Sequence, residues 1–257
     1  MLGSPIAHSK SPALHTAAYA ALGLNWRYEA IEVAESELAG FMAGLDASWR
    51  GLSLTMPLKR AVLPLLTESD ELVEHTGVAN TVVFDHGARG FNTDVYGITE
   101  AFRSNGVNAL DSVQILGGGA TAVSALVAVA ELGAKRVQLT LRDPSKGTAL
   151  VELGKTLGVE MVESSTPDAV ISTLPGHAVH DFEISEAVRA TAVLFDVAYD
   201  PWPSALASRW RGPVISGLEM LTLQALAQVR VFVSGSPDAV LDDESRVLAA
   251  MRGAVGL

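Results

Sequence analysis

A short apolar run at residues 113–116 is typical of a buried strand. Three glycines, Gly117, Gly118 and Gly119, follow it, and an Ala/Val-rich segment of about three to four helical turns comes next. A second strand is predicted at residues 136–141. The order strand, glycine turn, helix, strand predicts a βαβ unit of a parallel sheet.

The glycine turn fits the G-x-G-x-x-G/A spacing of a dinucleotide site, with Gly117, Gly119 and Ala122 in the three small positions. The first glycine permits the tight turn, and the second lets a pyrophosphate approach the backbone. The unpaired N–H groups at the start of the helix then face the phosphates. The alternative is a plain structural turn. The strand before it and the helix after it favour the dinucleotide site.

Shorter elements are predicted ahead of this unit. Ser11, directly before a proline, is a favourable N-cap for an Ala-rich helix. Residues 26–33 alternate polar and apolar positions, as a half-buried strand does. A helix is expected at residues 36–45, with Ser36 as its cap. Two further strands are predicted at residues 51–54 and 78–84.

Strands and helices are also predicted after the glycine turn. Two strand-like runs, at residues 169–172 and 192–197, extend the parallel sheet. In such sheets the loops after the strands face the ligand crevice. A long amphipathic helix is predicted at residues 218–232 and a final helix at residues 237–251.

Composition limits the classes of function. The chain has 257 residues, 49% of them hydrophobic, which suits one large domain or two small ones. A net charge of −11 argues against nucleic acid or an anionic membrane as a partner. No apolar run is long enough to span a bilayer, and no signal-peptide pattern is expected. The absence of cysteine fits a cytoplasmic protein and excludes a Cys nucleophile.

Four polar residues are candidates for ligand contacts. Ser9 and Ser11 are either turn and cap residues or hydroxyls that hold a small carboxylate. Lys59 follows a strand and a proline turn, where α/β proteins place ligand contacts, but a solvated lysine is the usual alternative. Asp94 caps the helix that follows it or is a buried acid partner for Lys59.

The meaning of other polar residues depends on burial. Gln224 and Gln228 lie one helical turn apart on one face. Such a pair is usually a solvated stripe, but buried amides need partners, which a polyhydroxy ligand can supply. His8, His15 and His75 have no spacing that indicates a metal site, and we expect them to be structural.

The chain closely resembles the shikimate dehydrogenase family along nearly its whole length. The resemblance is carried by ordered motifs: GSPIAHSKSPALH, SLTMPLK, GVANTVV, GFNTD, LGGGATA, DVAYDP and GLEMLTLQA. It implies an α/β fold with an N-terminal α/β substrate domain, residues 1–96 with 218–257. The remaining residues, 97–217, would form a Rossmann-like doubly wound dinucleotide-binding domain.

The resemblance also implies roles for single residues. It implies that Lys59 and Asp94 are the catalytic pair. It implies that the substrate is bound by Ser9, Ser11, Thr55, Lys59, Asn80, Asp94, Tyr199 and Gln224. It implies that the cofactor is bound by Gly117, Gly118, Gly119, Ala120, Arg142, Lys146, Thr173 and Gly217. No metal is implied.

The family reduces 3-dehydroshikimate to shikimate, a step of chorismate and aromatic amino acid biosynthesis, with hydride from NADPH. The alkoxide that develops on the ring needs a nearby positive charge and a proton. Lys59 can supply both, as general acid in reduction and base in oxidation. Asp94 would orient the ammonium group and anchor a neighbouring hydroxyl.

The cofactor and the activity have alternatives. Arg142 and Lys146 favour the 2′-phosphate of NADP, whereas Asp143 is the residue type that often marks NAD. NADP is favoured, and an NAD-preferring quinate/shikimate dehydrogenase is the alternative enzyme. A catalytically silent nucleotide-binding paralogue is the other alternative, against which the presence of both Lys59 and Asp94 argues. The expected partner is the small-molecule substrate, in a monomer or homodimer.

Overall fold

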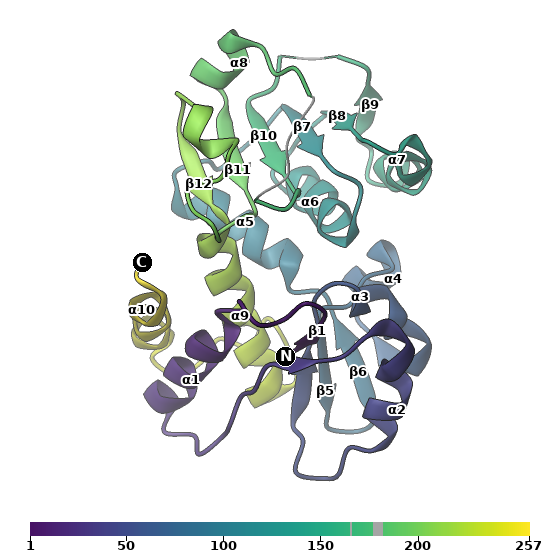
Figure 1. The fold of residues 1–257 in the computed structure, drawn as a ribbon, viewed down its shortest axis with the longest axis vertical. Coiled ribbons are helices and arrows are strands. Elements are labelled where there is room, and N and C mark those ends of the chain that lie inside the picture. Colours follow the sequence, from purple (N-terminus) through teal and green to yellow (C-terminus); the bar gives the residue numbers. More distant parts are fainter. Residues whose placement is uncertain (165, 177–181) are drawn as a thin grey trace. The chain divides into compact units, whose positions relative to one another are not determined.

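The structure is a computed structural model that describes residues 1–164, 166–176 and 182–257 (Figure 1). It divides into two compact units. We call Met1–Thr93 with Leu221–Leu257 the terminal unit, and Asp94–Met220 the central unit. No helix of the described residues is both long enough and apolar enough to cross a bilayer.

The terminal unit is built on short strands. They are β1 (Leu2–Gly3), β2 (Ile31–Glu32), β3 (Gly51–Ser53), β4 (Glu68–Ser69), β5 (Thr81–Phe84) and β6 (Ala88–Phe91). One sheet has the order β3-β5-β6-β4, in which β5 is antiparallel to both of its neighbours. In the other sheet β1 runs parallel to β2, and a parallel bridge from Leu2 to Leu54 connects β1 to the end of β3.

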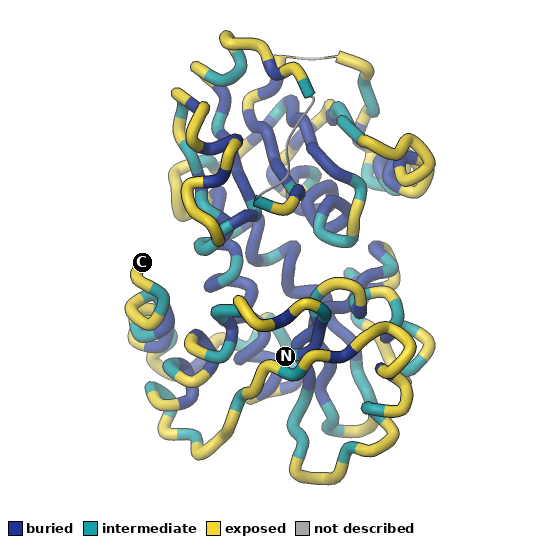
Figure 2. The backbone as a smooth tube through the Cα atoms, viewed as in Figure 1, coloured by how far each residue is buried: buried dark blue, intermediate teal, exposed yellow. Residues whose placement is uncertain are grey.

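The helices of the terminal unit come from both ends of the sequence. They are α1 (Ser11–Leu22), α2 (Leu38–Ala43), α3 (Leu58–Ala61), α4 (Glu71–Thr76), α10 (Glu244–Val255), the greater part of α9 (Gly217–Ser234) and the 3₁₀ turns η1 (Glu35–Glu37) and η2 (Leu63–Leu65). Apolar side chains of α1, α9 and α10 form one buried cluster. A second cluster joins β1, β3 and β5 to α2, α3 and α4. In Figure 2, which colours the backbone by burial, β5 is buried along most of its length, whereas β4 is exposed.

Four local predictions in the terminal unit are wrong. The final helix expected at residues 237–251 is α10, Glu244–Val255, because the residues before Glu244 form turns. The strand expected at residues 26–33 is reduced to β2, Ile31–Glu32. The helix expected at residues 36–45 is η1 followed by α2, and the Glu37 carboxylate, instead of Ser36, accepts the Ala34 N–H at its start, at 2.8 Å. Ser11 is the first residue of α1 and not its N-cap, which is Lys10.

The central unit is a six-stranded parallel sheet. Its strands are β7 (Ser112–Leu116), β8 (Arg136–Thr140), β9 (Glu160–Val162), β10 (Ala169–Ser172), β11 (Val193–Asp196) and β12 (Val214–Ser216). The order is β9-β8-β7-β10-β11-β12, so the strand order reverses between β7 and β10. This is the doubly wound dinucleotide-binding arrangement. The predicted α/β class with a Rossmann-like sheet is confirmed.

The strands of this sheet are rich in apolar residues, which pack against helices. Its helices are α5 (Asp94–Ser104), α6 (Ala120–Glu131), α7 (Gly147–Thr156) and α8 (Glu186–Thr191), with the 3₁₀ turns η3 (Pro144–Lys146) and η4 (Ala207–Arg209). Phe102 of α5 meets Phe195 of β11 edge to face, with ring centroids 5.1 Å apart. Trp210 is buried, and its indole N–H donates to the Ala192 carbonyl at 2.9 Å. The strands are therefore held from both sides by packed helices and loops.

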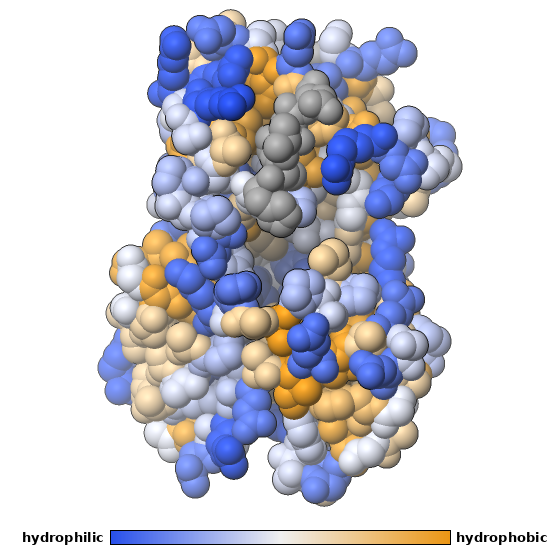
Figure 3. All heavy atoms as spheres, in the orientation of Figure 1, coloured by the Kyte–Doolittle hydropathy of each residue, from blue (hydrophilic) through white to orange (hydrophobic). Residues whose placement is uncertain are grey.

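The surface mixes polar and apolar residues. The large apolar side chains that are exposed include Met56, 66% exposed, and Val240, 70% exposed. On the face drawn in Figure 3, hydrophilic residues are interspersed with hydrophobic ones. Such a mixture is ordinary for a folded protein and needs no separate explanation.

Candidate active site

Asn80 lies at the centre of a buried polar network in the terminal unit. It directly precedes β5 and is 1% exposed. Its Oδ1 accepts hydrogen bonds from the Thr93 N–H at 2.9 Å and from the Thr81 hydroxyl at 2.8 Å. Its Nδ2 donates to Thr93 Oγ1 at 2.9 Å and to Gln224 Oε1 at 3.3 Å. The amide of Asn80 is thus held in one orientation by donors and acceptors that suit only that orientation.

Gln228 of α9 connects this network to the opposite side of the unit. Its Nε2 donates to the Asn80 carbonyl at 3.1 Å and to Thr81 Oγ1 at 3.0 Å. Its Oε1 accepts from the Ser53 hydroxyl at 2.9 Å and from His15 Nε2 at 3.1 Å. The side chain is 2% exposed, so protein partners take up its hydrogen-bonding capacity. Gln228 is a structural residue.

Gln224, one turn earlier, is 7% exposed. The two glutamines of α9 therefore do not form a solvated stripe. Besides the bond from Asn80, the Nε2 of Gln224 donates to the Leu221 carbonyl at 2.8 Å. A primary amide can take part in about four hydrogen bonds, so these two leave Gln224 capacity for a ligand. Of the two glutamines, Gln224 is therefore the better candidate for substrate contact.

His15 completes the buried network as a neutral ring. It stacks on Tyr28 with centroids 3.9 Å apart and an interplanar angle of 7°. Burial lowers the pKa of His15 to about 3, although the bond to Gln228 opposes the shift. Burial also raises the pKa of Tyr28, whose hydroxyl lies beside the hydroxyls of Ser53 and Ser11. His15 is thus part of the scaffold.

Ser9 and Ser11 belong to the turn that leads into α1. The Ser11 N–H donates to Ser9 Oγ at 3.2 Å, so Ser9 supplies the start of α1 with an acceptor that Lys10 does not. Ser9 is half-buried, and Ser11 is 1% exposed. The structure therefore places the two serines in one turn, with the Ser11 backbone N–H bonded to the Ser9 hydroxyl. Their contact with a substrate carboxylate stays a prediction.

Lys59 is placed by the turn between β3 and α3. The Leu58 N–H donates to the Thr55 carbonyl at 2.8 Å, and the Lys59 carbonyl accepts from the Ala79 N–H at 2.9 Å. Leu58 is fully buried and anchors this turn, while the side chains of Thr55 and Lys59 are half-buried. Because Ala79 directly precedes Asn80, the backbone of Lys59 is tied to the Asn80 network.

Asp94 and Tyr199 are the substrate candidates of the central unit. Asp94 is 3% exposed and is the first residue of α5, where the helix dipole stabilises a carboxylate. Tyr199 is half-buried in the segment after β11, and its pKa is raised by burial and by the charge of Asp200. Their contact with substrate stays a prediction.

The glycine turn lies at the point where the strand order of the central sheet reverses. Gly117 has φ +106°, and a Cβ there would come within 2.4 Å of the Thr173 hydroxyl oxygen. That hydroxyl donates to the Leu116 carbonyl at 2.9 Å, which holds the ends of β7 and β10 together. Gly119 is the N-cap of α6, and a Cβ on it would meet no heavy atom of the described residues within 4 Å. Gly119 therefore leaves open space beside a helix N-terminus, where a phosphate can bind.

The loop after β8 carries the predicted determinants of cofactor choice. A Cβ on Gly118 would come within 3.0 Å of Lys146 Cβ, so this loop packs against the glycine turn. Asp143 accepts from the Ser145 N–H at 3.0 Å and from its hydroxyl at 2.6 Å, and these bonds lower the pKa of Asp143. The carboxylate is therefore the cap of η3. Arg142 is exposed and stands next to it.

Gly217 is the first residue of α9, and Ala120 is the first residue of α6. A Cβ on Gly217 would lie 2.0 Å from the Val197 carbonyl oxygen, so the backbone packing of the protein itself requires glycine there. Its predicted role at the cofactor is not needed to explain the residue, and this role stays a prediction.

Sequence reasoning missed the scaffold behind the candidate residues. Ser53, Thr81, Gln228, His15 and Tyr28 form this scaffold, and their partners are up to 213 positions away in the sequence. The only local signal was the spacing of the two glutamines. Among the described residues no group of three or more His, Asp or Glu side chains is arranged to hold a metal ion.

A parallel sheet with this strand order and a glycine turn at its reversal point is typical of dinucleotide-dependent enzymes. Residues 1–82 match the sequence profile described as the shikimate dehydrogenase substrate binding domain. The NADP(+) shikimate dehydrogenase of Methanothrix thermoacetophila is 34% identical, over 100% of this chain and 97% of that protein.

Solved structures of shikimate dehydrogenases are also similar to this chain. Shikimate dehydrogenase from Mycobacterium tuberculosis is 38% identical, with a TM-score of 0.83 over 98% of this chain and 97% of that one. The Thermus thermophilus shikimate 5-dehydrogenase in complex with NADP(H) and shikimate is 28% identical, with a TM-score of 0.82 over 98% of this chain and 97% of that one. The chain belongs to the shikimate dehydrogenase family.

Proposed function

We propose that the chain catalyses the reversible reduction of 3-dehydroshikimate to shikimate with NADPH, in chorismate and aromatic amino acid biosynthesis. The full-length similarity to an NADP(+) shikimate dehydrogenase carries this proposal. The Asn80 network supports it, because a polyhydroxy ring acid needs fixed amide and hydroxyl groups. Residues 1–96 with 218–257 would bind the substrate, and residues 97–217 the dinucleotide.

The roles of the side chains follow from the reaction. NADPH supplies the hydride that adds to the ring carbonyl carbon. Lys59 stabilises the oxyanion that forms and transfers a proton to it, and in the reverse direction it removes that proton. Asp94 is the second member of the proposed catalytic pair. Ser9 and Ser11 hold the carboxylate, while Thr55, Tyr199 and Gln224 contact the ring substituents. Asn80 would join them by exchanging its bond to Gln224, because the other bonds of its amide stay within the protein.

The residues of the central unit suit NADP. Gly117, Gly118 and Gly119, with Ala120, would cradle the pyrophosphate at the start of α6, where Gly119 leaves room. Thr173 and Gly217 would also contact the cofactor. Arg142 and Lys146 would hold the 2′-phosphate. The Asp143 carboxylate caps η3 through Ser145, and this role explains the residue whether or not it contacts the ribose.

The test is initial-rate oxidation of shikimate and of quinate by the purified protein, with NADP and NAD in parallel. We expect turnover of shikimate with NADP, at a kcat/KM at least about tenfold above that with NAD. An NAD preference with quinate turnover would identify the quinate/shikimate enzyme. Nucleotide binding without turnover of either acid would identify a silent paralogue. A cytoplasmic location and a monomeric or homodimeric state stay predictions.

A further inference from the structure

A pocket of about 380 Å³ in the central unit is lined by none of the residues proposed to bind substrate or cofactor. Its volume is that of a small-molecule site. The lining residues come from α8 and from the segment between η4 and β12: Glu186, Arg189, Ser208, Arg209, Trp210 and Arg211. Three of them are arginines, in a chain whose net charge is −11. The pocket is therefore a local positive region on an acidic protein.

The pocket lies at the edge of the central sheet opposite to the glycine turn. α8 leads through Ala192 into the start of β11, and residues 210–213 lead into the start of β12 (Figure 1). The glycine turn, in contrast, follows the carboxyl end of β7. Because these strands are parallel, the starts of β11 and β12 and the end of β7 lie at opposite edges of the sheet. The pocket is therefore separate from the proposed dinucleotide site.

Hydrogen bonds fix the two segments that carry the arginines. The Arg211 and Gly212 N–H groups both donate to the Arg189 carbonyl, at 3.0 and 2.9 Å. The Trp210 indole N–H donates to the Ala192 carbonyl, and a Cβ on Gly212 would lie 2.6 Å from that same carbonyl oxygen. The backbones of Arg189 and Arg211 are thus held side by side before any ligand binds, which lowers the entropy cost of binding.

The arginine side chains have few partners within the protein. Neither Arg189 nor Arg209 forms an ion pair with a described residue. Arg211 pairs with Glu186 at 3.5 Å, but the two side chains are 71% and 73% exposed, and such pairs contribute little. The Nε of Arg189 is buried and has no hydrogen-bond partner among the described residues. A buried N–H without an acceptor costs free energy, which a bond to an anion would recover.

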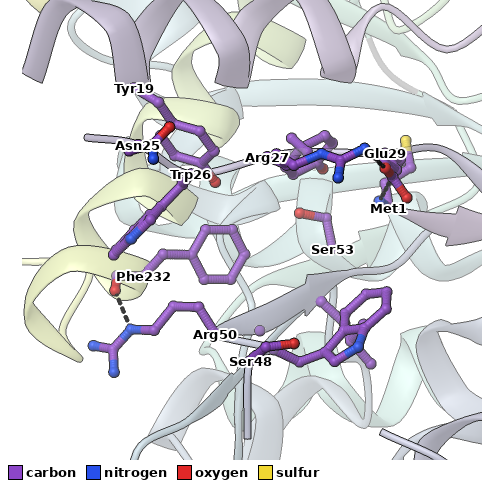
Figure 4. A pocket seen from close by; sticks show the side chains of 14 residues that line it. Met1, Tyr19, Asn25, Trp26, Arg27, Glu29, Ser48, Arg50, Ser53 and Phe232 are labelled. Carbon is purple, nitrogen blue, oxygen red and sulfur yellow. Dashed lines mark hydrogen bonds and ion pairs between the residues drawn. The ribbon is translucent and has the colours of Figure 1, made fainter. Parts of the chain in front are cut away.

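The cavity of the terminal unit provides a contrast, because its arginines already have acceptors. Arg27 and Arg50 line that cavity (Figure 4). Arg27 pairs with Glu29 at 3.1 Å. The Arg50 Nε donates to the Phe232 carbonyl at 2.5 Å, which Figure 4 marks with a dashed line. An arginine that lines a cavity therefore need not be left for a ligand, and in the central pocket it is.

We propose that Arg189, Arg209 and Arg211 form a binding site for a phosphate group, either inorganic phosphate or the phosphate of a small organic ester. The three arginines and Glu186 together leave a net charge of +2 in the pocket, which a phosphate dianion balances. Guanidinium groups bind phosphate oxygens through pairs of parallel hydrogen bonds, as a lysine cannot. This site goes beyond the proposed reaction and does not depend on it.

The experiment measures binding of inorganic phosphate and of phenyl phosphate to the purified chain by calorimetry, at constant ionic strength. We expect the dissociation constants to rise at least about tenfold in Arg189→Gln and in Arg209→Gln. Arg189→Lys keeps the charge without the paired donors and should weaken binding less. Arg60→Gln, an exposed arginine of α3, is the matched control and should bind as the unchanged chain does.

The same titrations on Arg142→Gln separate this pocket from the proposed 2′-phosphate site. We expect this variant to keep its affinity for both probes. Thermal midpoints without ligand should stay within about 2 °C of the unchanged chain for Arg189→Gln and Arg209→Gln, because neither side chain has an ion-pair partner to lose. That comparison shows that any loss of binding is not a loss of folding.

Three results would overturn the proposal. Unchanged affinity in both glutamine variants of the pocket would mean that its arginines bind no phosphate. Loss of binding in Arg142→Gln alone would place the phosphate in the cofactor loop. Equal heats from chloride or acetate would mean that the pocket attracts any anion without forming a site. Tighter binding of phenyl phosphate would identify an ester as the ligand and equal binding would identify free phosphate, and both support the site.

Discussion

The two units build their parts of the candidate site from different materials. In the terminal unit the parts are side chains, with Asn80, Gln224 and Gln228 held in one buried network of hydrogen bonds. In the central unit they are mostly backbone: Gly117 at φ +106° and Gly119 before a helix N-terminus. A side-chain site depends on its chemical groups, whereas a backbone site depends on the space that its glycines leave empty. The two should therefore respond differently to substitution.

The largest expected effect is on the chemical step. Replacing Lys59 (Lys59→Ala) removes the proposed proton donor, and we expect kcat for shikimate oxidation to fall about a thousandfold. The thermal midpoint should stay nearly unchanged, because the side chain is only half-buried. Arg60→Ala, the exposed basic neighbour on α3, is the matched control and should keep its activity. Turnover near that of the unchanged chain in Lys59→Ala would refute the assignment.

The two glutamines of α9 should separate scaffold from substrate contact. Gln228→Leu leaves four buried partners of the amide without their bonds, so we expect a loss of about 3 kcal/mol in unfolding free energy. Gln224→Leu breaks two bonds and should cost less stability but raise KM for shikimate about tenfold. Urea unfolding and steady-state kinetics on both variants measure this, and equal effects on both quantities would contradict it.

In the central unit the contrast is between two glycines of one turn. Gly117→Ala places a Cβ against Thr173 at a positive φ, so we expect about 2 kcal/mol of destabilisation. Gly119→Ala meets no neighbour, so the thermal midpoint should hold while KM for NADP rises about tenfold. Each variant serves as the control for the other. A stable Gly119→Ala with unaltered KM would place the pyrophosphate elsewhere.

The smallest expected effect is on the pH dependence of stability. The pKa of His15 is about 3 in the folded chain and 6.5 in the unfolded one. Below pH 6.5 the unfolded chain therefore takes up a proton that the folded chain refuses. His15 should thus lower the unfolding free energy by up to about 1.4 kcal/mol per pH unit as the pH falls from 6.5 toward 3.

His15→Asn should remove this slope between pH 6.5 and 5. The Met1 amine, whose pKa is lowered to about 5, also decreases the unfolding free energy between pH 8 and 5, and it does so in both proteins. Urea unfolding at pH 7, 6 and 5 provides the measurement. Identical slopes in the two proteins would show that His15 is protonated without unfolding.

What the sequence predicted well was local. The strand at residues 169–172 and the glycine turn depend on neighbouring residues, and the structure has β10 at Ala169–Ser172. The strand predicted at residues 26–33 was too long. Alternating residues form a strand only where a neighbouring strand pairs with them, and here only Ile31–Glu32 are paired. The network of Gln228, Ser53 and His15 could not be predicted, because it joins residues 175 and 213 positions apart.

The division into two units also has an optical consequence. Of the four tryptophans, Trp26 and Trp49 belong to the terminal unit, and Trp202 and Trp210 to the central unit. Trp210 is 8% exposed and bonded to the Ala192 carbonyl, whereas Trp26 is 37% exposed. The Trp210 indole therefore fluoresces from a rigid environment shielded from water, and only unfolding of the central unit exposes it. A red shift of Trp210 fluorescence therefore reports unfolding of the central unit. Quenching of Trp26 fluorescence by an added solute reports on the terminal unit.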